Sequence, residues 1–282
     1  MSSKREACGR QGKPKIVVFI APKKEIKHSV NKIITELKSR GWDILQIVEP
    51  GVMPQFDALI NADFIVSFGG DGTLLYAAKN VENLRIPILG VNFGRIGFLT
   101  EVSPEEFLSH LDLFEEGKYH IKVCKRLGAY NLEMELISTA LNEHVIITGK
   151  PGKVVSMDIY INDRYLGWFL ADGLIIASSI GSSAYAFSAG GPLVSEDLDV
   201  MVLVAIAPVL RKMPSIVIPC DAKIKVRIRE DSTRALLVSD GEIIKELNKG
   251  EVIIFTSSNR VTRLIRIRGA IERLNMALHL RS

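Results

Sequence analysis

The stretch Ser67-Phe68-Gly69-Gly70-Asp71-Gly72-Thr73 decides how the first part of the chain folds. The apolar run Asp63 to Phe68 leads into it and predicts a buried strand, and Leu74 to Lys79 continue with a helical pattern. Three glycines within four positions allow backbone angles and a close approach that side chains would block. The loop leads into a helix N-terminus, where free N–H groups and the helix dipole favour anions, so it predicts a phosphate site.

The aspartate inside this loop adds chemistry to the predicted phosphate site. A carboxylate among phosphates repels them unless it binds a metal ion or accepts a proton from an attacking hydroxyl. We therefore favour a functional role for Asp71. A tight strand-to-helix turn is the structural alternative, but it explains an acid among three glycines poorly. The loop also lacks the Gly-Lys-Ser/Thr ending of the Walker phosphate loop.

Around this loop, short β-rich runs alternate with segments long enough for helices. Ser103-Pro104-Glu105-Glu106 predicts the capped start of a helix that runs to Glu115. The alternation predicts a three-layer α/β domain with a parallel sheet over residues 14–118. Its strands are expected at Lys15–Ile20, Asp43–Val48, Asp63–Phe68 and Ile86–Val91, with a helix over Lys24–Arg40.

From about Tyr119 the pattern changes to short runs rich in Val, Ile and Tyr, separated by turn residues. This predicts a mainly antiparallel, β-rich second domain over residues 119–268. Ile271–Leu280 is expected to form an amphipathic helix that joins residues 269–282 to the first domain. The strands are expected at Leu132–Ser138, Glu143–Ile147, Val154–Ile161, Gly173–Ala177, Val200–Ile206, Ser215–Ile218, Ile224–Ile228 and Val252–Thr256.

Composition excludes several classes of protein. Hydrophobic residues make up 47% of the chain and charged residues 24%, as in globular proteins. The longest apolar runs are far shorter than the roughly 20 residues of a membrane span, so no membrane partner is expected. Most of the net charge of +4 lies in residues 1–13, which we expect to be a disordered basic tail. Nucleic acid is therefore not an expected partner.

Two further residue types carry expectations about compartment and surface. The three cysteines, Cys8, Cys124 and Cys220, are too scattered for a zinc site, and this sparse, odd number fits a reducing, cytoplasmic environment. Four arginines alternate with apolar residues near the end of the chain, and a solvated face is favoured over help with a polyanionic phosphate donor. They are Arg260, Arg263, Arg266 and Arg268.

Four motifs together carry a resemblance to a known family. Gly69-Gly70-Asp71-Gly72 resembles the motif shared by the NAD kinase, diacylglycerol kinase and phosphofructokinase superfamily, and alone it does not choose among them. The stretch Asn92–Thr100, the pair Asn142-Glu143 and the long Asp172–Pro192 segment resemble the NAD kinases specifically. Their order and spacing agree over about residues 15 to 280, which is nearly the whole chain.

The residues of these motifs also have a physical sense of their own. Phe98 on its glycine-flanked loop can stack on adenine or fill the core, and the residues alone leave this open. Asn142 can give and accept the hydrogen bonds of an adenine edge, and Glu143 can accept from a ribose hydroxyl; an ordinary turn is the alternative. Tyr185 offers a ring and a hydroxyl among small residues. Asp240-Gly241 fits a binding role or a hairpin turn equally well.

The resemblance implies transfer of a phosphoryl group from ATP or inorganic polyphosphate to the 2′-hydroxyl of the adenosine ribose of NAD, giving NADP. Asp71 would be the catalytic base, and Mg²⁺ or another divalent cation would be held through the phosphates, with Asp71 as its candidate protein ligand. The candidate residues for ATP and its phosphates are Gly69, Gly70, Gly72 and Thr73. The candidate NAD-binding residues are Asp71, Gly72, Phe98, Asn142, Glu143, Asp172, Ser183, Ala184, Tyr185, Ser188, Ile206 and Asp240.

The resemblance further implies a homodimer or homotetramer in which Asp172 and Ile206 reach a neighbouring subunit's site. Asp172 has no evident local base, and because a buried unpaired carboxylate is costly, it is expected to meet a ligand or another chain. The chain departs from the family pattern at Ala171, Ser179 and Ile180, which puts contacts at the last two in question. A lipid or small-molecule kinase of the same superfamily and a non-catalytic NAD-binding regulator remain as rival functions.

Overall fold

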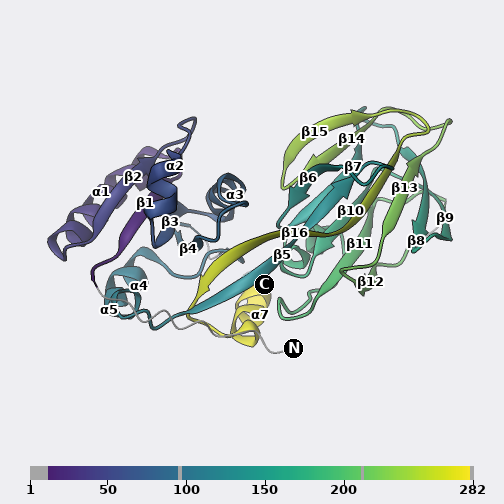
Figure 1. Cartoon of the computed structure of the whole chain (residues 1–282). Coiled ribbons are helices and arrows are strands. Elements are labelled where there is room, and N and C mark those ends of the chain that lie inside the picture. Colours follow the sequence, from purple (N-terminus) through teal and green to yellow (C-terminus); the bar gives the residue numbers. More distant parts are fainter. Residues whose placement is uncertain (1–11, 95–96, 211–212, 280–282) are drawn as a thin grey trace. The chain divides into compact units, whose positions relative to one another are not determined.

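The computed structural model describes residues 12–94, 97–210 and 213–279. The chain divides into two compact units, Met1–Cys124 with Val261–Ser282 and the intervening Lys125–Arg260. The second unit is thus inserted into the first, and strands β5 (His120–Tyr130) and β16 (Val252–Arg266) lead from one to the other (Figure 1). The tail expected to be disordered falls, over residues 1–11, outside the described residues, as does Cys8.

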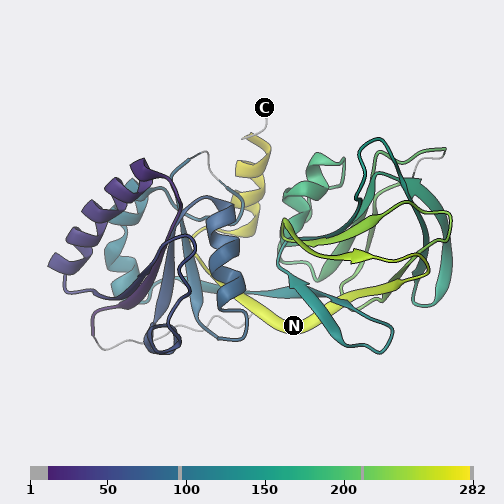
Figure 2. The same cartoon turned by 90° about the horizontal axis from the view of Figure 1, so that it is seen from above.

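The first unit holds a parallel sheet between two layers of helices, as the alternation predicts (Figure 2). Its strands are β1 (Lys15–Ile20), β2 (Asp43–Val48), β3 (Phe64–Gly69) and β4 (Pro87–Asn92), in the order β2-β1-β3-β4. Residues Arg263 and Leu264 of β16 extend the sheet by pairing parallel to β4. The helices are α1 (Lys24–Ser39), α2 (Phe56–Asn61), α3 (Asp71–Asn80), α4 (Pro104–Ser109), α5 (Leu111–Glu115) and α7 (Ala270–His279).

The two faces of this sheet bury different side chains because strand residues alternate. Helices α1, α4 and α5 pack on one face, where Leu37, Phe107 and Phe114 share a core with Phe64 and Phe68. Helix α3 packs on β3, β4 and β1, and its Tyr76 meets the ring of Phe19 edge-on at a 6.0 Å centroid distance. The resulting three layers fix the loops at the ends of the strands.

The predicted cap at Ser103 is confirmed, and the helix behind it is shorter than expected. Ser103 Oγ accepts from Glu106 N at 3.1 Å, and the Glu106 carboxylate accepts from Ser103 N at 2.8 Å. His110, with φ −111° and ψ 16°, leaves the helical region and separates α4 from α5. The single helix predicted to run to Glu115 is therefore two short ones.

The second unit consists of two antiparallel sheets with a shared apolar core, a β-sandwich. One sheet contains β8, β9, β13, the first part of β16, β5 and β6, and the other has the order β12-β11-β10-β7-β14-β15. A 3₁₀ helix (Ile180–Ser183) and α6 (Tyr185–Ser188) follow β10. The strands are β6 (Leu136–Ala140), β7 (Glu143–Thr148), β8 (Val155–Ile161), β9 (Arg164–Ala171), β10 (Gly173–Ser178), β11 (Val200–Ile206), β12 (Ile216–Pro219), β13 (Ile224–Ile228), β14 (Ala235–Ser239) and β15 (Glu242–Leu247).

The structure corrects part of the strand pattern predicted for this unit. The strand expected at Leu132–Ser138 begins only at Leu136, because Asn131 Oδ1 accepts from Glu135 N at 2.8 Å and closes a turn in which Met134 has a φ of 61°. Strand β16 continues well past the predicted end at Thr256. Strands β5 and β9 were not predicted, and the two strands that a hairpin turn at Asp240-Gly241 implies are β14 and β15. Within the described residues, no helix is long and apolar enough to cross a membrane.

Candidate active site

The glycine loop lies at the carboxyl end of β3, where the sheet reverses its order. Strand β1 has β2 on one side and β3 on the other, so the order of the strands reverses between β1 and β3. The carboxyl end of β3, where the glycine loop begins, therefore lies at a topological switch point. Ligands of open parallel sheets bind in the crevice at such points. The glycine loop therefore lies where folds of this kind have their binding crevice.

The three glycines of the loop have two different tasks. A Cβ on Gly69 would lie 2.3 Å from Thr73 Oγ1 and 2.9 Å from Ala21 Cβ, so this residue allows the strand to pack against the helix. A Cβ on Gly70 or Gly72 would meet nothing within 4 Å. Gly70 and Gly72 therefore present open backbone at the start of α3, where a phosphate can approach the helix N-terminus.

Two adjoining cavities open beside this loop. The first, of about 210 Å³, is lined by Gly72, Thr73 and Tyr76 together with residues that follow β1 and β2. The second, of about 270 Å³, shares Ile20, Ala21, Pro22 and Pro50 with it. Three lysines and one glutamate complete the second cavity: Lys23, Lys24, Lys27 and Glu49.

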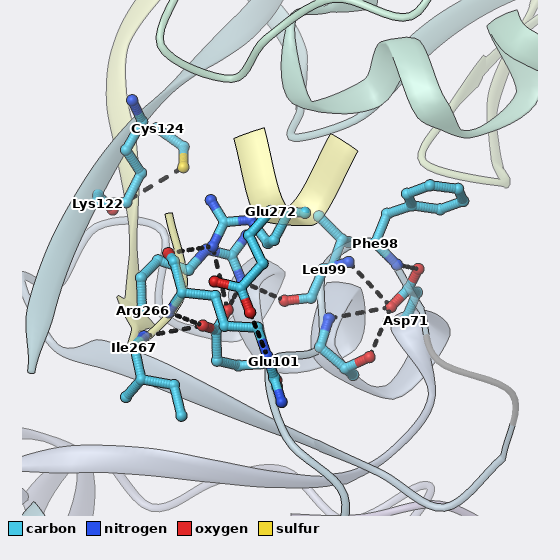
Figure 3. A network of polar contacts seen from close by, with 12 residues as sticks. Asp71, Phe98, Leu99, Glu101, Lys122, Cys124, Arg266, Ile267 and Glu272 are labelled. Carbon is cyan, nitrogen blue, oxygen red and sulfur yellow. Dashed lines mark hydrogen bonds and ion pairs between the residues drawn. The ribbon is translucent and has the colours of Figure 1, made fainter. Parts of the chain in front are cut away.

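Asp71, the first residue of α3, is held by a second loop of the same unit (Figure 3). Its Oδ2 accepts from Phe98 N at 2.8 Å, and its Oδ1 accepts from Leu99 N and Thr100 N, both at 3.1 Å, and from Thr100 Oγ1 at 3.3 Å. A Cβ on Gly97 would lie 2.0 Å from Oδ1, which explains the glycine. Within the described residues Oδ1 carries three of these bonds and Oδ2 one, so Oδ2 keeps acceptor capacity.

The Phe98 side chain extends away from the carboxylate that its own amide holds (Figure 3). It is half-buried. Phe98 is therefore not a fully buried core residue, and a role at the site stays a prediction. Arg95 and Ile96, in the same predicted motif, lie outside the described residues.

Behind this loop lies a buried ionic cluster that the sequence did not predict. The Glu101 carboxylate is fully buried and accepts from Arg266 Nη1 at 3.1 Å, from Arg273 Nη1 at 3.2 Å and from the Ile267 and Arg268 amides at 2.8 and 2.7 Å. Arg266 Nη1 also donates to Leu99 O at 2.7 Å. One peptide unit therefore joins the cluster to Asp71, because Leu99 O accepts from Arg266 and Thr100 N of the same peptide donates to the aspartate (Figure 3).

The expectation of a solvated arginine face is wrong at Arg266, which is 3% exposed. Leu264, Ile265 and Arg266 are all buried, so exposure does not alternate along this part of β16, and Glu101 compensates the charge of Arg266. The usable signal was Glu101, an acid directly after the apolar Phe98–Thr100 motif. An acid next to a buried strand predicts a buried basic partner, because an unpaired buried charge is costly.

In the second unit, Asn142 and Glu143 lie at the start of β7 and are almost fully buried. Asn142 Oδ1 and Glu143 Oε2 are buried and find no hydrogen-bond partner among the described residues. Burial raises the pKa of Glu143 to about 7, the negative charge of Asp240 adds to the rise, and the backbone N–H of Tyr185 opposes it. Buried polar atoms without a partner are costly, so this pair is prepared for a polar ligand.

Asp240-Gly241 forms the hairpin turn between β14 and β15 and also contacts the Asn-Glu pair. Both residues have positive φ, 47° and 84°, as a type I′ turn requires. The Asp240 carboxylate accepts from the backbone amides of residues 141–143. The hairpin turn is therefore confirmed, and a binding role for Asp240 stays a prediction.

The segment after β10 covers the same corner of the unit. Ser178 Oγ donates to Leu141 O at 2.6 Å and accepts from Gly181 N at 3.0 Å, which fixes the 3₁₀ turn beside residues 141–143. Ser183 is buried with its hydroxyl on Ile180 O at 3.1 Å, Ala184 leads into α6, and Tyr185 and Ser188 are exposed. Ile180, where the family pattern has a hydroxyl, is buried.

Asp172 and Ile206 do not join this group within one chain. They adjoin each other at the opposite end of β10, with Asp172 N donating to Ile206 O at 2.9 Å. That end lies roughly 17 Å from Ser178, since a strand rises about 3.3 Å per residue. Asp172 is also exposed, so the premise that it is a buried acid is wrong. Solvent, rather than a partner, accounts for its charge in the single chain.

The described residues contain no group of three or more His, Cys, Asp or Glu side chains that could hold a metal ion. Asp71 is the acid of the glycine loop, and both of its oxygens already accept backbone hydrogen bonds. This donor set fits a divalent cation that is coordinated mainly by phosphate oxygens and water. It does not fit a resident metal in an all-protein cage.

Comparison with known proteins agrees with this arrangement. The ATP-NAD kinase N-terminal domain matches residues 16–119, and the ATP-NAD kinase C-terminal domain matches residues 141–267. The NAD kinase of Methanothermobacter thermautotrophicus is 36% identical over 208 residues, 74% of this chain and 73% of that protein. The NAD kinase of Moorella thermoacetica is 36% identical over 256 residues, 87% and 82% of the two chains.

Solved structures show the same likeness. An NAD kinase from Archaeoglobus fulgidus in complex with ATP superposes with a TM-score of 0.76 at 29% identity, over 94% of this chain and 98% of that one. Yeast NADH kinase complexed with NADH superposes with a TM-score of 0.81 over 95% and 89%, and at 20% identity it is similar in fold alone. Fold and glycine loop thus define a kinase. The chain belongs to the ATP-NAD kinase family.

Proposed function

We propose that this chain transfers a phosphoryl group from ATP or inorganic polyphosphate to the 2′-hydroxyl of the adenosine ribose of NAD, giving NADP. The observation that carries the proposal is the buried pair Asn142-Glu143, whose Oδ1 and Oε2 atoms lack a partner among the described residues. An adenine edge and a ribose hydroxyl are hydrogen-bond donors of the kind these acceptors need. Relatives at 36% identity that are named NAD kinase support the choice of NAD.

The donor phosphates are assigned to the first unit. Gly70 and Gly72 offer open backbone at the N-terminus of α3, and Thr73 lines the adjoining cavity. The lysines of the second cavity, Lys23 and Lys24, supply positive charge for a polyanion. A divalent cation would come with the donor phosphates, where it would offset charge that develops during transfer. Asp71 is the acid of this loop that could reach it.

Asp71 is the proposed general base for the acceptor hydroxyl. Its Oδ1 is occupied by Leu99, Thr100 N and Thr100 Oγ1, whereas Oδ2 accepts only from Phe98 N among the described residues. Oδ2 is therefore the atom we assign to the proton of the 2′-hydroxyl. The four hydrogen bonds keep the carboxylate in one orientation, which reduces the cost of aligning it with the substrate.

The test is direct formation of NADP. Purified chain is incubated with NAD, Mg²⁺ and either ATP or polyphosphate, and NADP is detected with an NADP-specific dehydrogenase. We expect NADP with at least one donor and none when the donor is omitted. If NAD binds but no donor yields NADP, the chain is an NAD-binding regulator. If a lipid or another small molecule is phosphorylated in place of NAD, the assignment of the acceptor is wrong.

We further propose a homodimer or homotetramer in which Asp172 and Ile206 complete a neighbouring subunit's site. Their position at the far end of β10, away from Asn142, supports this, because one chain cannot bring them to its own adenosine site. An Asp71→Asn subunit mixed with an Asp172→Asn subunit should regain part of the activity, since some mixed sites carry neither change. A fully active monomer in light scattering would overturn the idea.

The remaining candidates from the sequence stay with this proposal. Ser183, Ala184, Tyr185 and Ser188 lie on the segment beside residues 141–143 and would contact the dinucleotide. We propose a cytoplasmic location, which the free cysteines Cys124 and Cys220 support, because reducing compartments keep thiols unpaired.

A further inference from the structure

Asp240 gathers three consecutive backbone amides around its carboxylate. Oδ2 accepts from Leu141 N at 2.7 Å, and Oδ1 accepts from Asn142 N at 2.8 Å and from Glu143 N at 3.3 Å. In return, Asp240 N donates to Glu143 O at 3.0 Å. The peptides that carry the two candidate adenosine-binding side chains are thus held by a single aspartate from about 100 residues later in the chain.

The aspartate is itself fixed on two sides. Arg126, which is 1% exposed, places Nη2 3.6 Å from Asp240 Oδ2, and its Nε donates to Thr139 Oγ1 at 3.0 Å. The hairpin turn fixes the backbone of Asp240 in the left-handed region. A carboxylate that three amides and a buried guanidinium surround has little room for a ligand. Its contacts are directed at the protein.

We propose that Asp240 is a positioning residue for dinucleotide binding: it orients the Asn142-Glu143 peptides toward the adenosine and places a negative charge beside Glu143. The inference rests on the proposed function, since it assumes that this pair binds NAD. It differs from a role in ligand contact, because Asp240 acts through the backbone of its neighbours. It also differs from a role in folding alone, because the charge of Asp240 has a consequence that can be measured.

That consequence concerns the protonation of Glu143, whose pKa burial raises to about 7 and to which the charge of Asp240 contributes. Arg126 lies behind Asp240, and His144 points to the opposite face of β7, where burial lowers its pKa to about 4, so it is neutral above pH 5. A ribose hydroxyl donates to the ionised Glu143. In the wild type, NAD affinity should therefore rise with increasing pH, with a midpoint at about pH 7. Without the charge of Asp240, the pKa of Glu143 falls, and the midpoint should lie at a lower pH.

The experiment measures the Kd for NAD by titration calorimetry from about pH 5.5 to 8.5, the range in which a group of this pKa titrates. Asp240→Asn suits the positive φ of the turn and removes the charge, and Asp240→Gly does the same with no side chain. Asp163→Asn is the matched control, because Asp163 lies in the two-residue β8–β9 turn with a φ of 62°, and its carboxylate accepts from Lys225 at the surface. Thermal melts compare the folding of all four proteins.

We expect Asp240→Asn to raise the Kd for NAD about tenfold at high pH, the scale of losing one charge-assisted hydrogen bond. The midpoint of the pH profile should also move to lower pH, while Asp163→Asn keeps the wild-type Kd and midpoint. A raised Kd with an unmoved midpoint in both Asp240 variants would overturn the inference, and so would an unchanged Kd. A wild type that binds no NAD at any pH would overturn the proposed function, and the inference with it.

Discussion

Two aspartates, one in each unit, hold three consecutive backbone amides, and the difference between them lies in what stands behind each carboxylate. Asp71 lies between the two open glycines, Gly70 and Gly72, and the loop that binds its carboxylate is anchored by Arg266 on Leu99 O. Asp240 sits in a hairpin turn and has Arg126 directly beside it. The same contact with three backbone amides therefore occurs at Asp71, the proposed base, and at Asp240, the proposed positioning residue. Free acceptor capacity, which Oδ2 of Asp71 keeps, separates the two.

The largest expected effect comes from removing the anchor behind the Asp71 loop. Among the described residues, Arg266→Met leaves Arg273 as the one charged partner of the fully buried Glu101 carboxylate. We expect the free energy of unfolding in urea to fall by about 3 kcal/mol, because a buried charge loses its compensation. Arg234→Met, which breaks an exposed pair with Glu246, is the control and should cost less than about 1 kcal/mol. Equal losses would contradict the role given to the cluster.

The next effect separates the two aspartates by their kinetic signature. Asp71→Asn keeps the size of the side chain and removes its basicity, so kcat should fall by about 10² or more with the Kd for NAD nearly unchanged. The Asp240→Asn variant should show the reverse, a weaker Kd with a smaller loss of kcat. Steady-state kinetics and calorimetry on both variants provide the comparison. Activity of Asp71→Asn within about threefold of wild type would remove Asp71 as the base.

A smaller effect is expected at the residue that the second aspartate positions. Glu143→Gln removes the charge that accepts from the ribose and should lower kcat/KM for NAD about tenfold at neutral pH. Because the titrating group is gone, the dependence of KM on pH near 7 should flatten. Calorimetry and turnover that both match wild type across this range would make Glu143 an ordinary turn residue.

The smallest effect tests whether the side-chain hydroxyl of Thr100 helps to orient Asp71. Thr100→Val removes only the hydroxyl that donates to Oδ1 at 3.3 Å and leaves the three amides in place. We expect kcat to fall about threefold, since one weak neutral donor is worth little. A fall as large as that of Asp71→Asn would mean that orientation, rather than basicity, dominates at this residue.

The sequence predicted what depends on neighbouring residues. The glycine loop, the strand before it and the capping box at Ser103 are local patterns, and the structure contains all three. The partners of Asp71 and Asp240 were not predicted, because they are long-range: Thr100 lies 29 residues from Asp71, and Leu141 lies 99 residues from Asp240. No periodicity encodes which amides a carboxylate will meet.

Burial of charged residues was the other limit. The pattern favours a solvated face for Arg266, which is buried, and a ligand or another chain for Asp172, which is exposed in the single chain. A charged residue is buried only when a partner compensates it, and that partner, such as Glu101 for Arg266, lies 165 residues away. The residue types of the candidate site could be predicted from local motifs. Which of these residues find a charge or hydrogen-bond partner within the protein depends on the fold.

The discontinuity of the first unit has a consequence for synthesis on the ribosome. The second unit is one continuous segment, so it can fold once Arg260 has emerged. The first unit starts earlier but lacks part of its sheet and the guanidinium that anchors Leu99 until Arg266 follows. A nascent chain stopped before Arg266 would thus display the glycine loop without its anchor. Competence for phosphoryl transfer is therefore expected only after Arg266 has been added, when the second unit is already complete.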